Sequence, residues 1–81
     1  MTITVKLFAI LREKAGTAEI MLELPSGSTV EKAVAELLNL KPELGTWVAR
    51  AAFAVNMTRV NGTTILNDKD ELALLPPVSG G

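Results

Sequence analysis

The C-terminal dipeptide Gly80-Gly81 is the feature of this sequence best suited to chemistry. A terminal carboxylate is ionised at neutral pH and is a poor electrophile, so it reacts only after activation, for example as an acyl-adenylate made from ATP. The activated acyl group could then take up sulfur to give a thiocarboxylate, or it could be captured by an amine. Because glycines lack a Cβ, they suit insertion of the chain end into a narrow active-site channel of another protein.

The two prolines before this dipeptide favour insertion as well. Pro76 and Pro77 have fixed φ angles, which lowers the entropy cost of ordering the segment. That cost is on the order of 1–2 kcal/mol per residue. We expect residues 76–81 to form a flexible tail outside the core. Taken alone, a terminal Gly-Gly more often marks an unpacked chain end, so its interpretation depends on the rest of the sequence.

The composition excludes several kinds of site. The 81 residues include neither Cys nor His, which excludes thiolate and imidazole catalysis and zinc sites built on these ligands. We expect no metal and no permanently bound cofactor. A net charge of −1 argues against nucleic acid, and the lack of a long apolar run argues against a membrane. The expectation that remains is a single cytoplasmic domain over residues 1–81, its last six residues being the tail.

Alternating apolar residues predict strands near both ends of the chain. In residues 2–9, the side chains of Ile3, Val5 and Leu7 fall on one face and that of Phe8 falls on the other. Further strands are predicted at residues 17–24, 53–57 and 71–75, with a shorter one between the last two.

A capping box predicts the start of the main helix. Ser28 is the expected N-cap, and Glu31 follows three residues later. Apolar residues at helical spacing form one stripe over residues 30–38, and Pro42 should stop the helix near residue 40. Short helical segments are expected at residues 10–15 and 44–52, and turns at residues 61–62 and 67–70. The acidic cluster of Asp68, Asp70 and Glu71 could face a basic partner, but we expect a solvated turn.

These elements predict an α+β fold of the β-grasp type. One main helix cannot cover both faces of four or five strands, so we expect a mixed four- to five-stranded sheet wrapped around it. The other sheet face is then left to solvent or a partner. Phe8 would be an exposed aromatic residue there, and Leu75 would join it if the last strand runs beside the first.

Two segments of the chain resemble the small subunit of molybdopterin synthase, the MoaD family of sulfur carriers. Residues 5–13 (VKLFAILRE) match the family pattern LFA-x-x-RE, and residues 70–81 (DELALLPPVSGG) match DE-x-A-x-x-PPV-x-GG. Residues 54–56 (AVN) are similar to the middle strand of the same family. The resemblance therefore spans essentially the whole chain.

The resemblance implies a ubiquitin-like fold and a non-catalytic subunit whose active site lies on a large partner subunit. It implies that an E1-like adenylating enzyme uses ATP to activate Gly81, that Gly81 becomes a thiocarboxylate, and that Gly80 is needed for fit in the channel. The sulfur then goes to precursor Z and builds the dithiolene of molybdopterin, within molybdenum cofactor biosynthesis. A cytoplasmic heterotetramer is the implied assembly.

The resemblance implies docking with the large subunit, and the residues themselves suggest which surface docks. This surface comprises an exposed aromatic residue, two arginines and the stem of the tail: Phe8, Arg12, Arg59, Leu75, Pro76, Pro77, Val78 and Ser79. The sequence departs from the family at Lys69, Leu75 and Arg59, where glycine, an aromatic residue and an apolar residue are frequent. These changes concern the partner surface and leave the tail chemistry unaffected.

Other functions stay open. The chain could be a sulfur carrier of another pathway, of the thiamine type, which also ends in Gly-Gly. It could be a ubiquitin-like modifier that forms isopeptide bonds to lysines. From a different class, it could be an interaction domain whose tail is inert.

Overall fold

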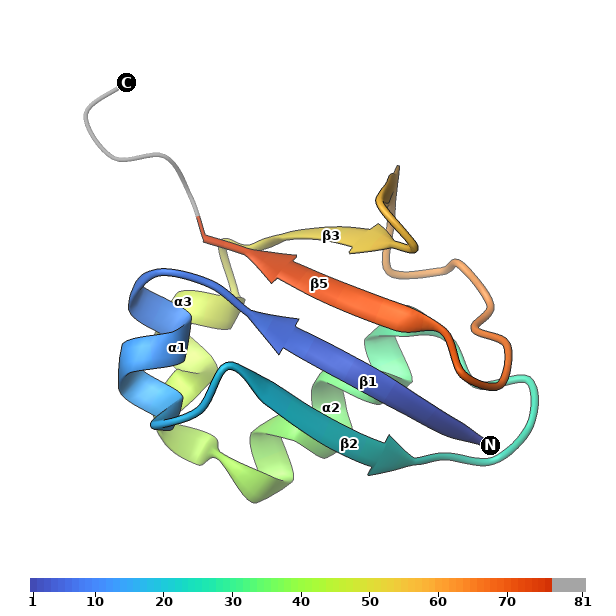
Figure 1. Ribbon diagram of the computed structural model, residues 1–81, viewed down its shortest axis with the longest axis horizontal. Helices are drawn as coiled ribbons and strands as arrows, with labels where there is room; N and C mark the ends of the chain where they lie inside the picture. Colours follow the sequence, from blue (N-terminus) through green and yellow to red (C-terminus); the bar gives the residue numbers. More distant parts are fainter. Residues whose placement is uncertain (77–81) are drawn as a thin grey trace.

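A five-stranded mixed sheet forms the centre of the computed structural model, which describes residues 1–76 (Figure 1). The strands lie in the order β2-β1-β5-β3-β4. Only β1 and β5 pair in parallel; the other neighbours are antiparallel. The strand bounds are Thr2–Leu7 for β1, Glu19–Glu23 for β2, Ala52–Val55 for β3, Thr58–Val60 for β4 and Glu71–Leu75 for β5. This arrangement confirms the predicted α+β β-grasp fold.

All helical segments lie on one face of this sheet (Figure 1). The main helix α2 crosses behind β1 and β2 in the view shown, and shorter segments cap one end of the core. Gly16 ends the first of these in the left-handed conformation that glycine adopts without strain. The bounds are Ile10–Ala15 for α1, Val30–Leu40 for α2, Pro42–Leu44 for the 3₁₀ turn η1 and Gly45–Val48 for α3.

The N-cap of α2 is Thr29, so the prediction of Ser28 was wrong by one residue. Thr29 Oγ1 accepts a hydrogen bond from the backbone N–H of Lys32 at 3.3 Å. Thr29 also keeps an extended backbone because it forms a β-bridge with Ile65. The helix therefore begins at Val30, and the Ser28 hydroxyl instead donates to the carbonyl oxygen of Pro25 at 2.7 Å.

The core lies between the helices and the covered face of the sheet. The predicted alternation in the first strand is confirmed, since Ile3, Val5 and Leu7 are all buried. Leu37 of α2 and the β5 residues Leu72 and Leu74 are also buried. Burying such a side chain contributes about 1.5–3 kcal/mol, and with no disulfide to help, this packing must hold the domain.

The strand predicted at residues 53–57 ends two residues earlier. Asn56 and Met57 have φ angles of 48° and 71°, as the central residues of a two-residue type I′ hairpin turn require. They join β3 to β4, whereas the predicted turn at residues 61–62 lies after β4. The sequence signal for a hairpin was missed because such a turn usually carries glycine at its second position.

The acidic turn before β5 is only partly solvated, which corrects the prediction. Asp70 is 8% exposed, and its carboxylate accepts hydrogen bonds from Asn56 Nδ2 at 2.9 Å and from the backbone N–H of Asn67 at 2.8 Å. Asn56 Oδ1 accepts in turn from the backbone N–H of Glu71 at 3.0 Å. This network holds the β3–β4 turn against the start of β5.

β5 is the last strand before the predicted tail. Of residues 76–81, only Pro76 is among the described residues. Within residues 1–76, none of the helices combines the length and apolar character needed to cross a membrane.

Candidate partner-binding site

The face of the sheet opposite the helices, called here the open face, collects residues from distant parts of the chain. Leu7 and Leu74 are paired across β1 and β5 and point into the core. Because successive side chains alternate between faces, Phe8 and Leu75 emerge on the open face. Both line one shallow groove, in which Phe8 is 44% exposed.

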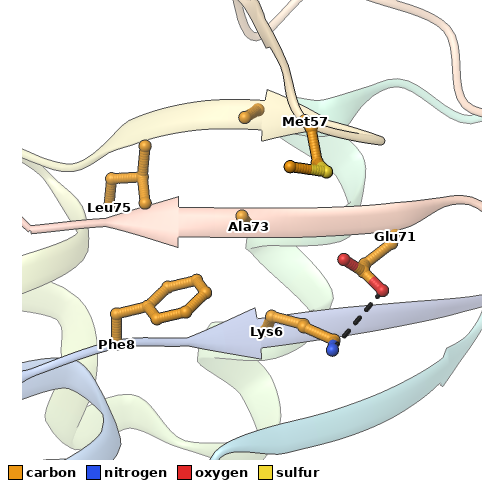
Figure 2. Close-up of a pocket in the computed structure, with 7 residues that line it drawn as sticks. Lys6, Phe8, Met57, Glu71, Ala73 and Leu75 are labelled. Atoms are coloured by element: carbon orange, nitrogen blue, oxygen red, sulfur yellow. Dashed lines mark ion pairs between the residues drawn. The ribbon is translucent and has the colours of Figure 1, made fainter.

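The groove is hollow because its floor is made of small residues. Ala73 of β5 and Ala54 of β3 are directly opposite in the antiparallel register and contribute only methyl groups. Phe8 and Leu75 stand toward one end, and Met57 stands toward the other (Figure 2). The groove has a volume of about 430 Å³, which is room for apolar side chains of a partner.

An ion pair borders the groove on the β1 side. Lys6 Nζ lies 3.5 Å from Glu71 Oε2 and 3.8 Å from Glu19 Oε1 (Figure 2 shows the first contact). All three side chains are well exposed, so these pairs add little to stability. Their effect is to give this border of the groove a defined charge pattern.

Arg59 lies on the same face one strand beyond the groove floor, although it does not line the groove itself. It is paired with Ala54 in the β3–β4 register, and directly opposed residues share a face of the sheet. A row of cross-strand neighbours therefore runs over the open face from β1 to β4, through Lys6, Ala73, Ala54 and Arg59. Within residues 1–76, Arg59 forms no ion pair.

Non-glycine residues with positive φ angles lie at both ends of the groove, and a further one, Lys69 with φ 70°, lies in the turn before β5. Ala9, directly after Phe8, has φ 50° and ψ −124°, and Met57 has φ 71°. Neither residue is glycine, which adopts such angles at no steric cost. Strained positions of this kind tend to mark functional surfaces. At Met57 the strain accompanies a side chain that is 94% exposed, which no contribution to the core explains.

The other predicted partner-binding residues lie elsewhere. Arg12 is an exposed residue of α1 and does not line the groove. Pro76 directly follows Leu75 and is half-buried. The remaining predicted residues, Pro77, Val78, Ser79, Gly80 and Gly81, lie outside the described residues.

Sequence reasoning missed most of the groove. Lys6, Glu71 and Ala73 could have been placed on the open face by the same alternation that placed Phe8 and Leu75. Met57 could not, because it belongs to a turn that the sequence did not reveal. The site as a whole offers apolar surface with charged borders, and it reaches Leu75, the last residue of β5.

The comparison with protein families gives one match over nearly the whole chain. Residues 5–81 match the profile described as the ThiS family. A curated relative named molybdopterin synthase sulfur carrier subunit, from Arabidopsis thaliana, is 39% identical over 79 residues, which cover 98% of this chain and 82% of the relative.

Solved structures resemble the whole fold. The crystal structure of SAMP1 from Haloferax volcanii superposes with a TM-score of 0.92 at 30% identity and covers 100% of both chains. A chain from the Helicobacter pylori complex of subunits 1 and 2 of molybdopterin-converting factor superposes with a TM-score of 0.73 at 28% identity, again over 100% of both chains.

Proposed function

The chain belongs to the ThiS family, and from this premise we propose that it is the sulfur carrier subunit of a molybdopterin synthase. The Arabidopsis relative carries that description, and the Helicobacter pylori chain was solved together with a second subunit. Sulfur carriage also accords with a chain that has no Cys or His and therefore few reactive groups besides its terminus.

One observation carries this proposal: the groove reaches the end of the strand that precedes the chain end. Leu75 lines the groove and is the last residue of β5, and Gly81 is the sixth residue after it. An extended chain spans at most about 3.3–3.6 Å per residue, which gives the six residues a reach of about 20 Å. A partner docked in the groove can therefore receive Gly81 in an active site of its own.

The chemistry that we propose takes place on Gly81. An E1-like adenylating enzyme transfers AMP from ATP to the carboxylate, releasing pyrophosphate. A sulfur nucleophile then displaces AMP and leaves a thiocarboxylate, so that one oxygen has been replaced by sulfur. Gly80 allows the terminus to enter a narrow channel because it has no Cβ. Two such thiocarboxylates each transfer one sulfur to precursor Z, because the dithiolene of molybdopterin contains two sulfur atoms, and each Gly81 returns to a carboxylate.

The partners in this scheme are the large synthase subunit and the adenylating enzyme. We propose that Phe8 and Leu75 supply the apolar contact in the groove, because exposed apolar patches with polar borders are typical of interfaces. Arg12 and Arg59 would contribute charged contacts around it. Pro76, Pro77, Val78 and Ser79 would line the entrance to the partner's active site.

An intact-mass measurement tests the carrier function. The chain is co-expressed with its adenylating enzyme and a sulfur source, and we expect its mass to rise by the difference between sulfur and oxygen. A variant lacking Gly81 should fold normally and show no such rise. Sulfur transfer that persists without Gly81 would contradict the proposal, as would an unmodified terminus in the complete chain.

A second candidate function is protein modification. It is favoured by the likeness to SAMP1, a small archaeal modifier protein. The same acyl-adenylate would then be captured by a lysine amine, giving an isopeptide bond. Conjugates that disappear when Gly81 is deleted would support this function, and mass spectrometry of cell extracts would identify them.

A sulfur carrier of the thiamine type is the remaining alternative within the family. It shares the activation of Gly81 and differs in the acceptor of the sulfur. Reconstitution with the large synthase subunit and precursor Z separates the two, because only the molybdopterin carrier should yield molybdopterin.

A further inference from the structure

We propose that the open face orients its partner by a charge polarity across the groove. In this arrangement Arg59, on the β4 side, meets a carboxylate of the partner, and the acidic residues on the β2 side meet a cation. The occupant is a protein surface with an apolar side chain between groups of opposite charge. This inference rests on the proposed function, because it names the chemistry of the surface that docks on the carrier.

The basic side of this polarity is Arg59. Its strand, β4, is the outermost strand of the sheet that residues 1–76 form. Across from it, Ala54 has only a methyl group and offers no hydrogen-bond acceptor. Because Arg59 has no ion-pair partner within residues 1–76, its guanidinium remains available for a bidentate contact with a carboxylate.

The acidic side begins at the opposite edge of the sheet and extends to the central strand β5. Glu19 and Glu23 are exposed residues of β2, and Glu71 projects from β5. Within residues 1–76, the ammonium group of Lys6 contacts Glu19 and Glu71, and Glu23 forms no ion pair. Glu23 accepts a hydrogen bond from the Thr2 hydroxyl at 2.6 Å, which leaves its charge uncompensated. This side of the face therefore carries excess negative charge.

The groove lies between these two borders and is apolar. The floor, formed by Ala54 and Ala73, carries no charge. The electrostatic potential therefore changes from positive near Arg59 to negative on the β2 side of the groove. Complementary charges at the rim of an interface steer encounter and fix register more than they add affinity. A partner with the matching polarity would dock in one orientation, and that orientation would place its active site toward the end of β5.

To test this inference, the rate of association with the large synthase subunit of the same organism is measured at several salt concentrations. Arg59→Gln should lower the rate by about three- to tenfold at low salt and make it less dependent on salt. Glu19→Gln should lower it as well, whereas Arg59→Lys should restore most of the rate. Lys32→Gln is the control, since it removes an exposed cation from α2, on the other side of the sheet.

The outcomes separate this inference from the proposed function. If the unaltered chain binds the large subunit and Arg59→Gln binds at the same rate, the charge polarity is overturned and the carrier function stands. If the unaltered chain does not bind, both are overturned. Sedimentation of the chain alone gives a further check, because a dimer abolished by Arg59→Gln would assign this face to a second copy instead.

Discussion

The covered face and the open face of the sheet are built from alternate residues of the same strands, yet they hold different side chains. On the covered face, Ile3, Val5, Leu72 and Leu74 are each 0% exposed. On the open face, short alanines form a floor and Met57 is 94% exposed. The covered face is packed against helices and supplies stability. The open face leaves apolar surface exposed to water, which costs free energy. A binding partner that covers this surface recovers that free energy.

The largest effect should come from breaking the covered face. Leu74→Ala removes a fully buried side chain from β5 and should lower the free energy of unfolding by about 2–5 kcal/mol. Its neighbour provides a matched control, because Leu75→Ala makes the same chemical change on the open face. Chemical denaturation of both variants measures the difference.

We expect the free energy of unfolding of Leu75→Ala to lie within about 1 kcal/mol of that of the unaltered protein. The same variant should bind the large subunit more weakly. Equal losses of stability in the two variants would show that the faces do not differ in the way described.

A smaller loss of stability is expected from the network that positions Met57. Asp70→Ala leaves the side-chain amide of Asn56 and the backbone N–H of Asn67 without their acceptor, which should cost about 1–3 kcal/mol. Because this network holds the β3–β4 turn, amide hydrogen exchange should also rise at Asn56 and Met57. Asp68→Ala is a suitable comparison, since Asp68 is exposed and accepts a hydrogen bond from the backbone N–H of Thr2 at 2.8 Å, so its loss should leave exchange at the β3–β4 turn unchanged. Unchanged exchange at the turn would argue against the positioning role.

Substitution of the aromatic residue on the open face should affect binding more than folding. Phe8→Ala removes a side chain that is 44% exposed and should weaken binding of the large subunit by about tenfold. Titration calorimetry measures the affinity, and thermal unfolding checks that the fold is retained. Leu40→Ala, at an exposed position at the end of α2 on the other side of the sheet, should change the affinity much less. A Phe8→Ala variant that binds normally would remove this residue from the interface.

The smallest effect is expected at Met57, where one substitution should raise the stability of the domain and lower its affinity for the large subunit. Met57→Gly relieves a left-handed conformation that is unfavourable for residues other than glycine and should raise stability by about 1 kcal/mol. The same change removes an apolar wall of the groove, so binding of the large subunit should weaken. Stability and affinity that move together would show that Met57 is present for folding rather than for recognition.

Much of the covered face could be predicted from the sequence. The alternation through Ile3, Val5 and Leu7 placed the first strand and its inward face, and the spacing of apolar residues placed the main helix. These patterns are readable because burial acts on every second residue of a strand and on one stripe of a helix. The cap was misplaced because a β-bridge to Ile65 holds Thr29 in an extended conformation, and that contact is distant in sequence.

The open face was harder to predict from the sequence, because pairing between distant strands brings its residues together. Phe8 and Leu75 were identified separately, and only the parallel pairing of β1 with β5 brings them together. The roles of Met57 and Asp70 could not be predicted from the sequence. Met57 belongs to an unusual turn, and Asp70 belongs to a buried hydrogen-bond network.

The sequence by itself determined the fold class, the core stripes and the terminal Gly80-Gly81, because these depend on local periodicity and on residue type. Only the tertiary structure decided that Ala54 and Ala73 form a hollow floor, that Arg59 and Glu19 lie at opposite borders, and that the groove leads into β5. The physical reason is that strand order and register bring together residues up to about seventy positions apart, and no local pattern encodes that pairing.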